Sequence, residues 1–493
     1  MPTSLLLRRR GNRCRPAGPR APEWGSVSQP RARIAIIGGG PGGYEAALVA
    51  AQLGAEVTVV ERDGLGGACV LTDCVPSKTL IASSGMMAAI DASPGLGLLI
   101  DSGRNGAVRV DAARLYARVR ALAMAQSADV ASRLSAEGVK VISGAARLDG
   151  PHAVVAGDVR VQADAVLIAT GAEPRVLPGS EPDGDRILTW RQLYELPELP
   201  AELIVVGSGV TGAEFASAYQ ALGSQVTLVS SRDRVLPQED ADAAVVVEDV
   251  FRRRGMTVLS RSRAERVTRS ADGVVVTLTD GRTVRGTHCL MTVGMVPSTT
   301  GLGLAEAGIE VDERGFVRVD RVSRTSAPGV YAAGDCTGVL MLASVAGMQG
   351  RIAMWHALGE AVKPLRLRNV AATIFTDPEI ATVGVPEHAV ASGAVADAIV
   401  VKLPLATNAR AKMQGFRDGF VKLIASRSAG TVLGGVIVAP RASELILAVS
   451  LAVERHLTVD QVAQTFSVYP SLSGSVTEAA RKLMQPAELD PLI

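Results

Sequence analysis

Two cysteines that lie close together in the sequence are the first residues with evident chemistry. Cys69 and Cys74 are separated by four residues, and the chain holds five cysteines in all. An odd number without regular spacing argues against a secreted disulfide framework. In a reducing compartment, such a close pair is typical of a catalytic dithiol. We therefore expect a redox-active pair in a cytoplasmic protein, with Cys289 and Cys336 as buried packing residues.

A glycine-rich turn precedes the cysteine pair. Residues 33–37, which are apolar after Arg33, predict a buried parallel strand, and a G-x-G-x-x-G pattern follows before a helix-favouring segment. Gly38 permits the tight turn, Gly40 lets the backbone approach a pyrophosphate, and Gly43 lets the helix pack close to the strand. Glu61, at the end of the next predicted strand, is suited to accept hydrogen bonds from both ribose hydroxyls of a dinucleotide.

The same order of strand, turn, helix and strand recurs at residues 203–230. Its glycines are Gly207, Gly209 and Gly212. One such turn is weak evidence, because unrelated α/β proteins also contain glycine-rich turns, but two in the same setting indicate two dinucleotide sites. Two dinucleotides in one chain favour a redox relay, in which one cofactor is held tightly and the other is exchanged.

The second unit has no carboxylate at the position equivalent to Glu61. Its second predicted strand runs instead into Ser231 and Arg232. A carboxylate would repel a 2′-phosphate, whereas a hydroxyl and a guanidinium would bind one. This difference favours NADPH, with NADH tolerated. The alternative is that Arg232 simply faces solvent.

The segment around the cysteines resembles a known family. Residues 66–78 read GGACVLTDCVPSK, a pattern similar to that of the pyridine nucleotide-disulfide oxidoreductases, the family of dihydrolipoyl dehydrogenase, glutathione reductase and mercuric reductase. Four later segments match the same family in order, namely 169–171, 331–335, 375–379 and 469–473. The resemblance spans roughly residues 33–485. It implies a flavoprotein that binds FAD and NAD(P)H, with Thr170 and Gly171 in the FAD site.

The resemblance also implies roles for individual residues. Cys69 would be the outward-facing sulfur that exchanges with a substrate, and Cys74 the sulfur that faces the flavin. Lys78 would lie near flavin N5, where a cation helps the ring to accept hydride, and Glu214 would pair with Lys78. Asp335 would hydrogen-bond the ribitol of FAD. Without the family pattern, Lys78 and Glu214 would be two unconnected residues on helix surfaces.

One segment departs from the disulfide-reducing members of the family. Those proteins carry a His-Pro segment followed shortly by Glu, and the histidine shuttles protons to and from the dithiol substrate. Here Tyr469 stands at the histidine position and Gly474 at the glutamate position, and none of the five histidines lies in this segment. A phenol with a pKa of ~10 is a poor base at pH 7, whereas an imidazole near ~6.5 can both take and give a proton.

This paired loss favours a quinone as the electron acceptor. A quinone takes hydride from the reduced flavin and can collect its proton from water or from Tyr469. We therefore predict an FAD-dependent NAD(P)H:quinone oxidoreductase, similar to the quinone reductase branch of the family. Because the Cys69/Cys74 pair is intact, dihydrolipoyl dehydrogenase or another NAD(P)H-dependent disulfide reductase stays an alternative.

Two further functions are weighed against this prediction. Mercuric reductase needs an extra cysteine pair near the C-terminus, and residues 481–493 contain no cysteine. A non-enzymatic flavoprotein subunit, or a protein that binds DNA through its Arg-rich start, would not need two dinucleotide motifs together with Lys78 and Glu214.

These elements indicate an α/β fold with two Rossmann-like dinucleotide-binding domains and a C-terminal α/β dimerisation domain. The expected segments are a disordered Arg-rich extension at 1–31, an FAD domain at 32–171, an NAD(P)H domain at 172–290, a central segment that returns to the FAD domain at 291–365, and an interface domain at 366–493. We expect a homodimer in which the segment with Tyr469 reaches the partner's flavin.

Composition limits the partners of the protein. A chain of 493 residues is too long for a single core, and its net charge of +2 is nearly neutral. We expect no metal and no nucleic-acid partner. Because no apolar stretch approaches the ~18 residues that cross a bilayer, a quinone would be met in water or by peripheral contact with a membrane surface.

Overall fold

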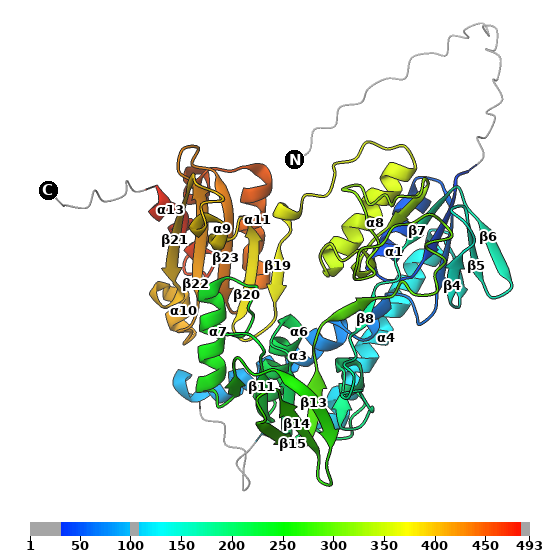
Figure 1. Cartoon of the computed structure of the whole chain (residues 1–493). Helices are drawn as coiled ribbons and strands as arrows, with labels where there is room; N and C mark the ends of the chain where they lie inside the picture. The colour runs from blue at the N-terminus through cyan, green and yellow to red at the C-terminus, as the bar shows by residue number, and fades with distance from the viewer. Residues whose placement is uncertain (1–30, 99–107, 485–493) are drawn as a thin grey trace, which may run out of the picture. The chain divides into compact units, whose positions relative to one another are not determined.

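The computed structural model describes residues 31–98 and 108–484. Residues 1–30, for which a disordered extension is predicted, lie outside the described residues. In the part that is described, three five-stranded sheets provide the frame on which the helices pack (Figure 1). Among these residues we find no helix with both the length and the apolar character needed to cross a membrane.

The first sheet is parallel throughout and has the order β18-β7-β1-β2-β3. Its strands are β1 (Arg33–Ile37), β2 (Glu56–Glu61), β3 (Lys140–Ser143), β7 (Ala165–Ile168) and β18 (Val330–Ala332). After Arg33, the apolar residues of β1 are all buried, as expected for a strand covered on both faces. The helices α1 (Pro41–Gln52) and α8 (Ala343–Ala357) pack against each other at close range. A Cβ on Gly350 would lie only 2.1 Å from the carbonyl oxygen of Gly42.

The second sheet repeats this plan with the order β12-β11-β10-β16-β9, again parallel. Its strands are β9 (Ile187–Leu188), β10 (Glu202–Val206), β11 (Gln225–Val229), β12 (Thr257–Leu259) and β16 (His288–Met291). The helices of this unit are α6 (Val210–Ala221) and α7 (Ala241–Arg253). A small antiparallel sheet packs on the apolar side chains Ile204 and Val206 of β10, and its strands are β13 (Ala264–Arg269), β14 (Val274–Leu278) and β15 (Thr283–Gly286).

The third sheet is antiparallel and has the order β19-β20-β23-β22-β21. Its strands are β19 (Ala372–Ile374), β20 (Glu379–Gly384), β21 (Ala398–Pro404), β22 (Phe420–Ser426) and β23 (Val432–Ala439). The helices beside it are α9 (Glu387–Ala391), α10 (Ala409–Met413), α11 (Ala442–Arg455), α12 (Val459–Ala463) and α13 (Gly474–Leu483). Apolar residues of β20, β22 and β23 form one core with α11, α12 and α13.

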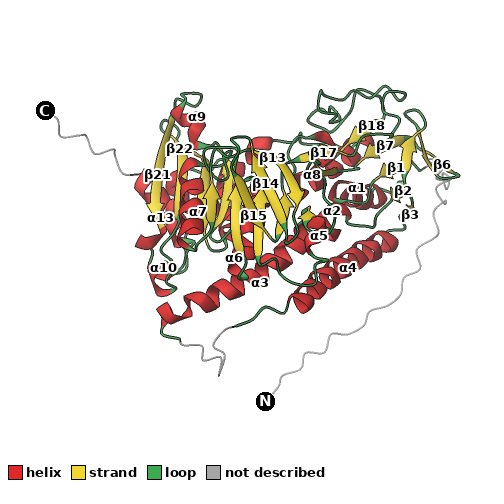
Figure 2. Cartoon of the chain, turned by 60° about the horizontal axis from the view of Figure 1, so that its bottom comes forward, coloured by secondary structure: helices red, strands yellow, loops and turns green. Residues whose placement is uncertain are grey.

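Further helices and strands connect or flank these units. They are α2 (Gly67–Leu71), α3 (Cys74–Ala92), α4 (Ala112–Ala136), α5 (Trp190–Leu193), β4 (Ala146–Leu148), β5 (Ala153–Ala156), β6 (Val159–Gln162), β8 (Ala172–Pro174) and β17 (Met295–Pro297). The helix α3 contacts both α4 and α6, so it links the two nucleotide-binding units (Figure 2). The predicted α/β fold with two Rossmann-like units and a C-terminal α/β layer is confirmed. The domain boundaries given above stay predictions.

A buried lysine connects the third sheet to the second unit. The Lys422 side chain in β22 is fully buried, and its Nζ lies 2.8 Å from Asp240 Oδ2 and 2.9 Å from Asp242 Oδ2. These two carboxylates stand at the start of α7, and a third ion pair joins Lys422 to Glu387 of α9. Because a buried ammonium is stable only with such partners, this cluster fixes α7 against the sheet.

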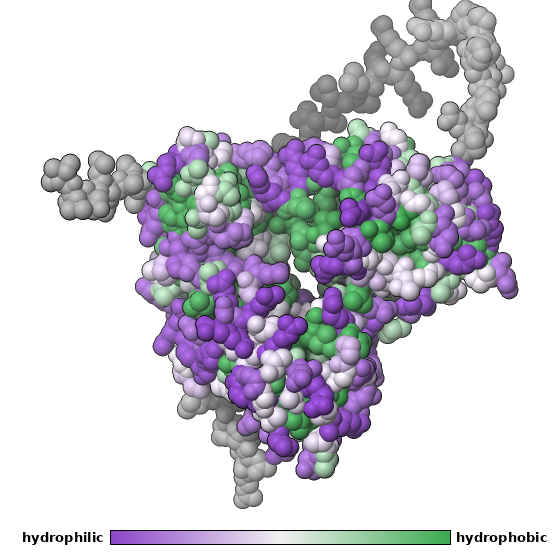
Figure 3. All heavy atoms as spheres, in the orientation of Figure 1, coloured by the Kyte–Doolittle hydropathy of each residue, from purple (hydrophilic) through white to green (hydrophobic). Residues whose placement is uncertain are grey.

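Apolar side chains also remain exposed. On the face seen in Figure 3, hydrophobic side chains gather near the middle, and hydrophilic ones cover most of the rest. The most exposed large apolar side chains of the described residues stand in the loop before α13, where Phe466 is 104%, Val468 77% and Tyr469 86% exposed. Such a group of exposed large apolar residues is typical of a surface that another protein covers.

Candidate active site

The first glycine turn admits only glycine at two of its three positions. Gly38 has φ +104°, and a Cβ there would lie 2.3 Å from the carbonyl oxygen of Ala169. A Cβ on Gly43 would lie 1.9 Å from the carbonyl oxygen of Gly38. At Gly40 the nearest atom to such a Cβ would be 3.9 Å away, so space is left beside the start of α1. This geometry is what a bound pyrophosphate requires at a helix N-terminus.

The second turn repeats these contacts. A Cβ on Gly207 would lie 2.3 Å from the carbonyl oxygen of Thr292, and one on Gly212 would lie 1.9 Å from that of Gly207. Gly209, directly before α6, has no atom within 4 Å of the position of a Cβ. Both turns therefore close tightly against a strand and stay open at the middle glycine.

Glu61 stands beside the first turn. Its carboxylate accepts hydrogen bonds from the backbone N–H of Gly39 at 2.5 Å and of Asp63 at 2.6 Å. It lines a cavity of about 440 Å³ together with Gly38 and Thr170. Because backbone N–H groups hold the carboxylate in place, its remaining lone pairs point in fixed directions.

The residues around this cavity fit FAD. Thr170 Oγ1 is buried and has no hydrogen-bond partner among the described residues, although buried hydroxyls are normally paired. Gly171, the next residue, has φ +73° and open space at the position of a Cβ. An unpaired hydroxyl and an open glycine beside a dinucleotide turn are features that a polar cofactor would satisfy. Asp335 begins a short 3-10 helix after β18 and is half-buried, and burial together with the charge of Asp73 raises the pKa of Asp335 to about 6.

The two cysteines meet where α2 gives way to α3. Cys69 lies within α2, and Cys74 is the first residue of α3, at the positive end of the helix dipole. A hydrogen bond between the two sulfurs lowers the pKa of Cys74 and raises that of Cys69, and the positive charge of Lys78 also lowers the pKa of Cys74. The thiolate is therefore favoured on Cys74, the sulfur expected to face the flavin.

Lys78 and Glu214 are brought together from α3 and α6. Lys78 Nζ lies 2.8 Å from Glu214 Oε2, and the Glu214 side chain is only 4% exposed. The other oxygen of Glu214 accepts a hydrogen bond from the backbone N–H of Phe375 at 2.9 Å, and the ring of Phe375 lies 4.9 Å from Lys78 Nζ. Burial opposes the ammonium, but the charges of Glu214, Cys74 and Asp73 and the hydrogen bond to Glu214 together outweigh it and raise the pKa of Lys78. The alternative that Lys78 and Glu214 are unconnected is wrong.

Ser231 and Arg232 lie exposed after β11. The buried hydroxyl of Ser230 shapes this turn, because it shares a hydrogen bond of 2.7 Å with Ser208 Oγ and accepts one from the backbone N–H of Arg232. Asp233 forms an exposed ion pair with Arg261 at 2.8 Å. An exposed guanidinium fits both interpretations of Arg232, and its contact with a 2′-phosphate stays a prediction.

Neither Tyr469 nor a histidine is among the groups that shift the pKa of Cys69 or Cys74 within the described chain. Tyr469 is 86% exposed in the loop before α13. Two histidines have side-chain partners of their own, since His356 Nδ1 shares a hydrogen bond with Tyr331 and His288 Nδ1 with Thr287. Within residues 31–98 and 108–484, no hydrogen bond joins any histidine to either cysteine of the pair.

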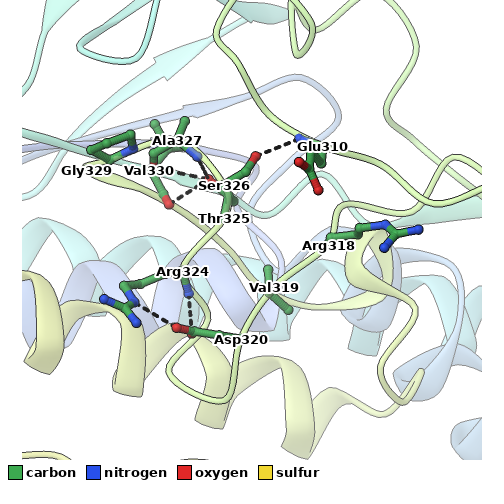
Figure 4. A pocket seen from close by; sticks show the side chains of 11 residues that line it. Glu310, Arg318, Val319, Asp320, Arg324, Thr325, Ser326, Ala327, Gly329 and Val330 are labelled. Atoms are coloured by element: carbon green, nitrogen blue, oxygen red, sulfur yellow. Dashed lines mark hydrogen bonds and ion pairs between the residues drawn. The ribbon is translucent and has the colours of Figure 1, made fainter.

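A second cavity lies outside this site. It measures about 490 Å³ and is lined by residues of a single stretch, 310–330 (Figure 4). Arg324 Nε donates to Asp320 Oδ2 at 2.7 Å within it, and Arg318 also borders it. None of the residues predicted from the sequence lines this cavity, so it is not part of the candidate active site.

Further residues beside the cysteines were not predicted from the sequence. Asp73, directly before Cys74, is a half-buried carboxyl whose pKa is raised by burial. Tyr194 is 3% exposed, and its hydroxyl has no hydrogen-bond partner among the described residues. A charged residue inside the cysteine segment was a visible signal for Asp73, whereas nothing in the sequence places Tyr194 near it.

Comparison with known families matches nearly the whole chain. The family described as pyridine nucleotide-disulphide oxidoreductase matches residues 32–350, and the dimerisation domain of that family matches residues 370–480. An NAD(P)H dehydrogenase (quinone) from Mycobacterium tuberculosis is 57% identical over 472 residues, which cover 93% of this chain and 95% of the relative. A dihydrolipoyl dehydrogenase from Chlorobaculum tepidum is 36% identical over 461 residues, which cover 92% of this chain and 97% of that one.

Solved structures show the same relationship. The crystal structure of LpdA from Mycobacterium tuberculosis has a TM-score of 0.87 at 56% identity and covers 92% of this chain and 100% of its own. The HOCl-induced flavoprotein disulfide reductase RclA from Escherichia coli has a TM-score of 0.81 at 26% identity, with 91% of this chain and 99% of its own covered.

Proposed function

The chain belongs to the pyridine nucleotide-disulphide oxidoreductase family, and we propose that it is an FAD-dependent NAD(P)H dehydrogenase whose electron acceptor is a quinone. The observation that carries this proposal is the absence of an imidazole from the segment where disulfide-reducing members have one. Tyr469 occupies that position, and Gly474 replaces the glutamate that would orient the imidazole. The relative with 57% identity is named NAD(P)H dehydrogenase (quinone), which supports the same acceptor.

The first turn and its surroundings hold FAD. When bound, FAD supplies a two-electron carrier between NAD(P)H and the acceptor. Gly40 leaves room for the pyrophosphate, Glu61 accepts hydrogen bonds from the ribose hydroxyls, and Thr170 and Asp335 pair with polar groups of the cofactor. Lys78, fixed by Glu214 at 2.8 Å, keeps a positive charge at the junction of the two nucleotide-binding units. That charge favours the movement of negative charge toward the flavin site.

The second turn holds the nicotinamide nucleotide. Gly209 leaves the N-terminus of α6 open to a pyrophosphate, and Ser231 and Arg232 extend the site toward a 2′-phosphate. With no carboxylate at the ribose position, NADPH is preferred over NADH. The exposed positions of Ser231 and Arg232 let the nucleotide enter and leave, as an exchanged cofactor must.

The chain functions as a homodimer. The dimerisation segment includes the loop with Phe466, Val468 and Tyr469. The apolar side chains of this loop are exposed to solvent in a single chain. A second copy would cover them, because an exposed phenylalanine gains about 1.5–3 kcal/mol on full burial. In such a dimer Tyr469 would reach the partner's acceptor site, where its hydroxyl can donate a hydrogen bond to a quinone oxygen.

Steady-state kinetics with two acceptors test the proposed function. Purified holoenzyme is assayed with menadione and with lipoamide, each driven by NADPH and by NADH. We expect menadione to give a kcat/KM at least about 100-fold above that of lipoamide, in keeping with the loss of a general base that contributes about 10²–10⁴-fold. Lipoamide turnover that rivals menadione turnover would refute the proposal that the acceptor is a quinone.

A disulfide reductase is the second candidate function. It is favoured by the intact cysteine pair, with Cys69 in α2 and Cys74 as the first residue of α3. If the acceptor is a quinone reduced directly, Cys69→Ser retains menadione reduction within a few-fold. A loss above about 100-fold, equal to about 2.7 kcal/mol of activation free energy, would show that the electrons pass through sulfur.

A further inference from the structure

The carboxyl of Asp73 is in an unusual position for a residue before a helix. It precedes the first residue of α3, where an aspartate commonly accepts a hydrogen bond from the helix backbone. Here the side chain makes no such capping hydrogen bond, and no other hydrogen bond to its carboxyl is found among the described residues. The group is nevertheless half-buried. A carboxyl that is neither capping a helix nor fully solvated is available for another role.

The surroundings of this carboxyl contain unpaired polar atoms. The Tyr194 hydroxyl and Arg191 Nε are both buried without a hydrogen-bond partner in the described chain. Tyr194 is only 3% exposed. Burial raises the pKa of its hydroxyl, and the negative charges of Asp73 and Glu214 raise it further. Buried polar atoms without partners are rare, and several in one place indicate that a bound molecule or water completes their hydrogen bonds.

Seven charged or titratable groups face Asp73 from five elements and a loop. They are Cys69 of α2, Cys74 and Lys78 of α3, Arg191 of α5, Tyr194 after it, Glu214 of α6 and Asp335 of the 3-10 helix. Asp73 therefore lies among the groups of the candidate active site, directly before Cys74.

We propose that Asp73 is the proton donor that replaces the missing imidazole in this enzyme. The inference rests on the proposed function. Reduction of a quinone by NAD(P)H consumes one proton besides the hydride, so that quinone, NAD(P)H and H⁺ give quinol and NAD(P)⁺. The carboxyl O–H bond of Asp73 breaks as the O–H bond of the quinol forms. The carboxylate then regains its proton from solvent, since Asp73 is only partly buried.

The electrostatics of the site suit a carboxyl acid. Burial raises the pKa of Asp73, Glu214 raises it further, and Lys78 and Arg191 oppose this shift. A raised pKa keeps the acid form populated closer to neutral pH than an ordinary carboxyl allows. Because the acid form is the active one, turnover is present below the pKa of Asp73 and is lost as pH rises through it.

The test compares Asp73→Asn with Asp91→Asn, an exposed aspartate at the other end of α3. Holoenzymes are assayed with menadione and with ferricyanide, a one-electron acceptor that takes up no proton. We expect Asp73→Asn to lose at least about 10-fold in kcat/KM for menadione while ferricyanide reduction stays within about twofold. The fall in menadione turnover at alkaline pH should disappear in Asp73→Asn. Asp91→Asn should resemble the wild type. Equal losses with both acceptors, or an unchanged menadione profile, would overturn the proposal.

An infrared pH titration gives a readout independent of activity. The carbonyl stretch of a protonated carboxyl should titrate above the usual carboxyl range in the wild type and in Asp91→Asn. Subtracting the Asp73→Asn spectrum isolates this signal from that of Asp335. A wild-type spectrum without it would refute the inference. If lipoamide proves the better acceptor, the proposed function fails, and the ratio of lipoamide to ferricyanide turnover in Asp73→Asn still decides the role of Asp73.

Discussion

At the scale of single residues, the pairing of Lys78 with Glu214 is the contact most closely tied to electron transfer. Removing the charge of Glu214, whose side chain is 4% exposed, leaves Lys78 without the carboxylate that raises its pKa. We expect Glu214→Gln to slow the reduction of bound FAD by NADPH by about 10–100-fold, because a misplaced or neutral lysine no longer favours charge transfer.

Stopped-flow absorbance of the flavin measures this rate. Glu198→Gln is the matched control, because Glu198 is exposed and lies outside the site. FAD content should be similar in both variants, so that a slower rate is not a result of cofactor loss. An unchanged rate in Glu214→Gln would mean that the ion pair only stabilises the fold.

The sequence predicts residues of this kind to different extents. Lys78 and Glu214 are 136 positions apart, so spacing alone cannot pair them, and the family pattern supplies the expectation. An aspartate directly before a helix commonly serves as a cap, so the sequence alone does not indicate another role for Asp73. Two of the charges that act on it, Arg191 of α5 and Glu214 of α6, come from distant parts of the chain that the local sequence cannot place.

At the scale of elements, each glycine turn sets the distance between a strand and a helix. A Cβ on Gly212 would lie 1.9 Å from the carbonyl oxygen of Gly207 and 2.7 Å from Thr292 Oγ1. In Gly212→Ala the helix α6 must therefore move away from β10. Its N-terminus is then no longer correctly placed to bind the pyrophosphate. We expect the KM for NADPH to rise by about 10-fold or more, with FAD retained.

Initial-rate kinetics over a range of NADPH concentrations check this expectation. Gly85→Ala is the control, because Gly85 lies within α3 with no atom within 4 Å of a Cβ. Alanine there is expected to be neutral or to stabilise the helix by up to about 1 kcal/mol. An unaltered KM in Gly212→Ala would show that the turn tolerates the methyl group.

Elements with strong local signals were predictable from the sequence. The two strand-turn-helix units follow from apolar runs and glycines at fixed offsets, and they occur at β1-α1 and β10-α6 as expected. The antiparallel order of the third sheet depends on pairing between distant strands, for which only the family resemblance gave guidance. The short helix α5, with Trp190 and Tyr194 buried beside it, had no distinctive sequence signal.

At the scale of the whole molecule, the cluster around Lys422 joins the second unit to the third sheet. A lysine within a strand would ordinarily be assigned to the solvent face, yet this one is fully buried among Asp240, Asp242 and Glu387. Lys422→Met leaves these carboxylates without their cation. Because breaking a buried ion pair costs about 3–5 kcal/mol, we expect a fall in Tm of several degrees.

Scanning calorimetry at matched protein concentration measures this difference, with the exposed Lys363→Met as control. Although burial opposes it, hydrogen bonds from Lys422 and Lys402 lower the pKa of Asp242. A lowered pKa gives stability that is present above the usual carboxyl pKa of ~4 and is lost as pH falls. The Tm difference between wild type and Lys422→Met should therefore shrink in acid. Equal Tm values at neutral pH would mean that the cluster does not stabilise the protein.

The most direct test of the account restores the imidazole and its partner. The double substitution Tyr469→His and Gly474→Glu places the histidine and glutamate of the disulfide-reducing members in the same loop. We predict that the ratio of lipoamide to menadione turnover rises by at least about 10-fold in this variant, since a proton carrier then faces the sulfurs. An unchanged ratio would contradict the claim that the missing imidazole determines the acceptor.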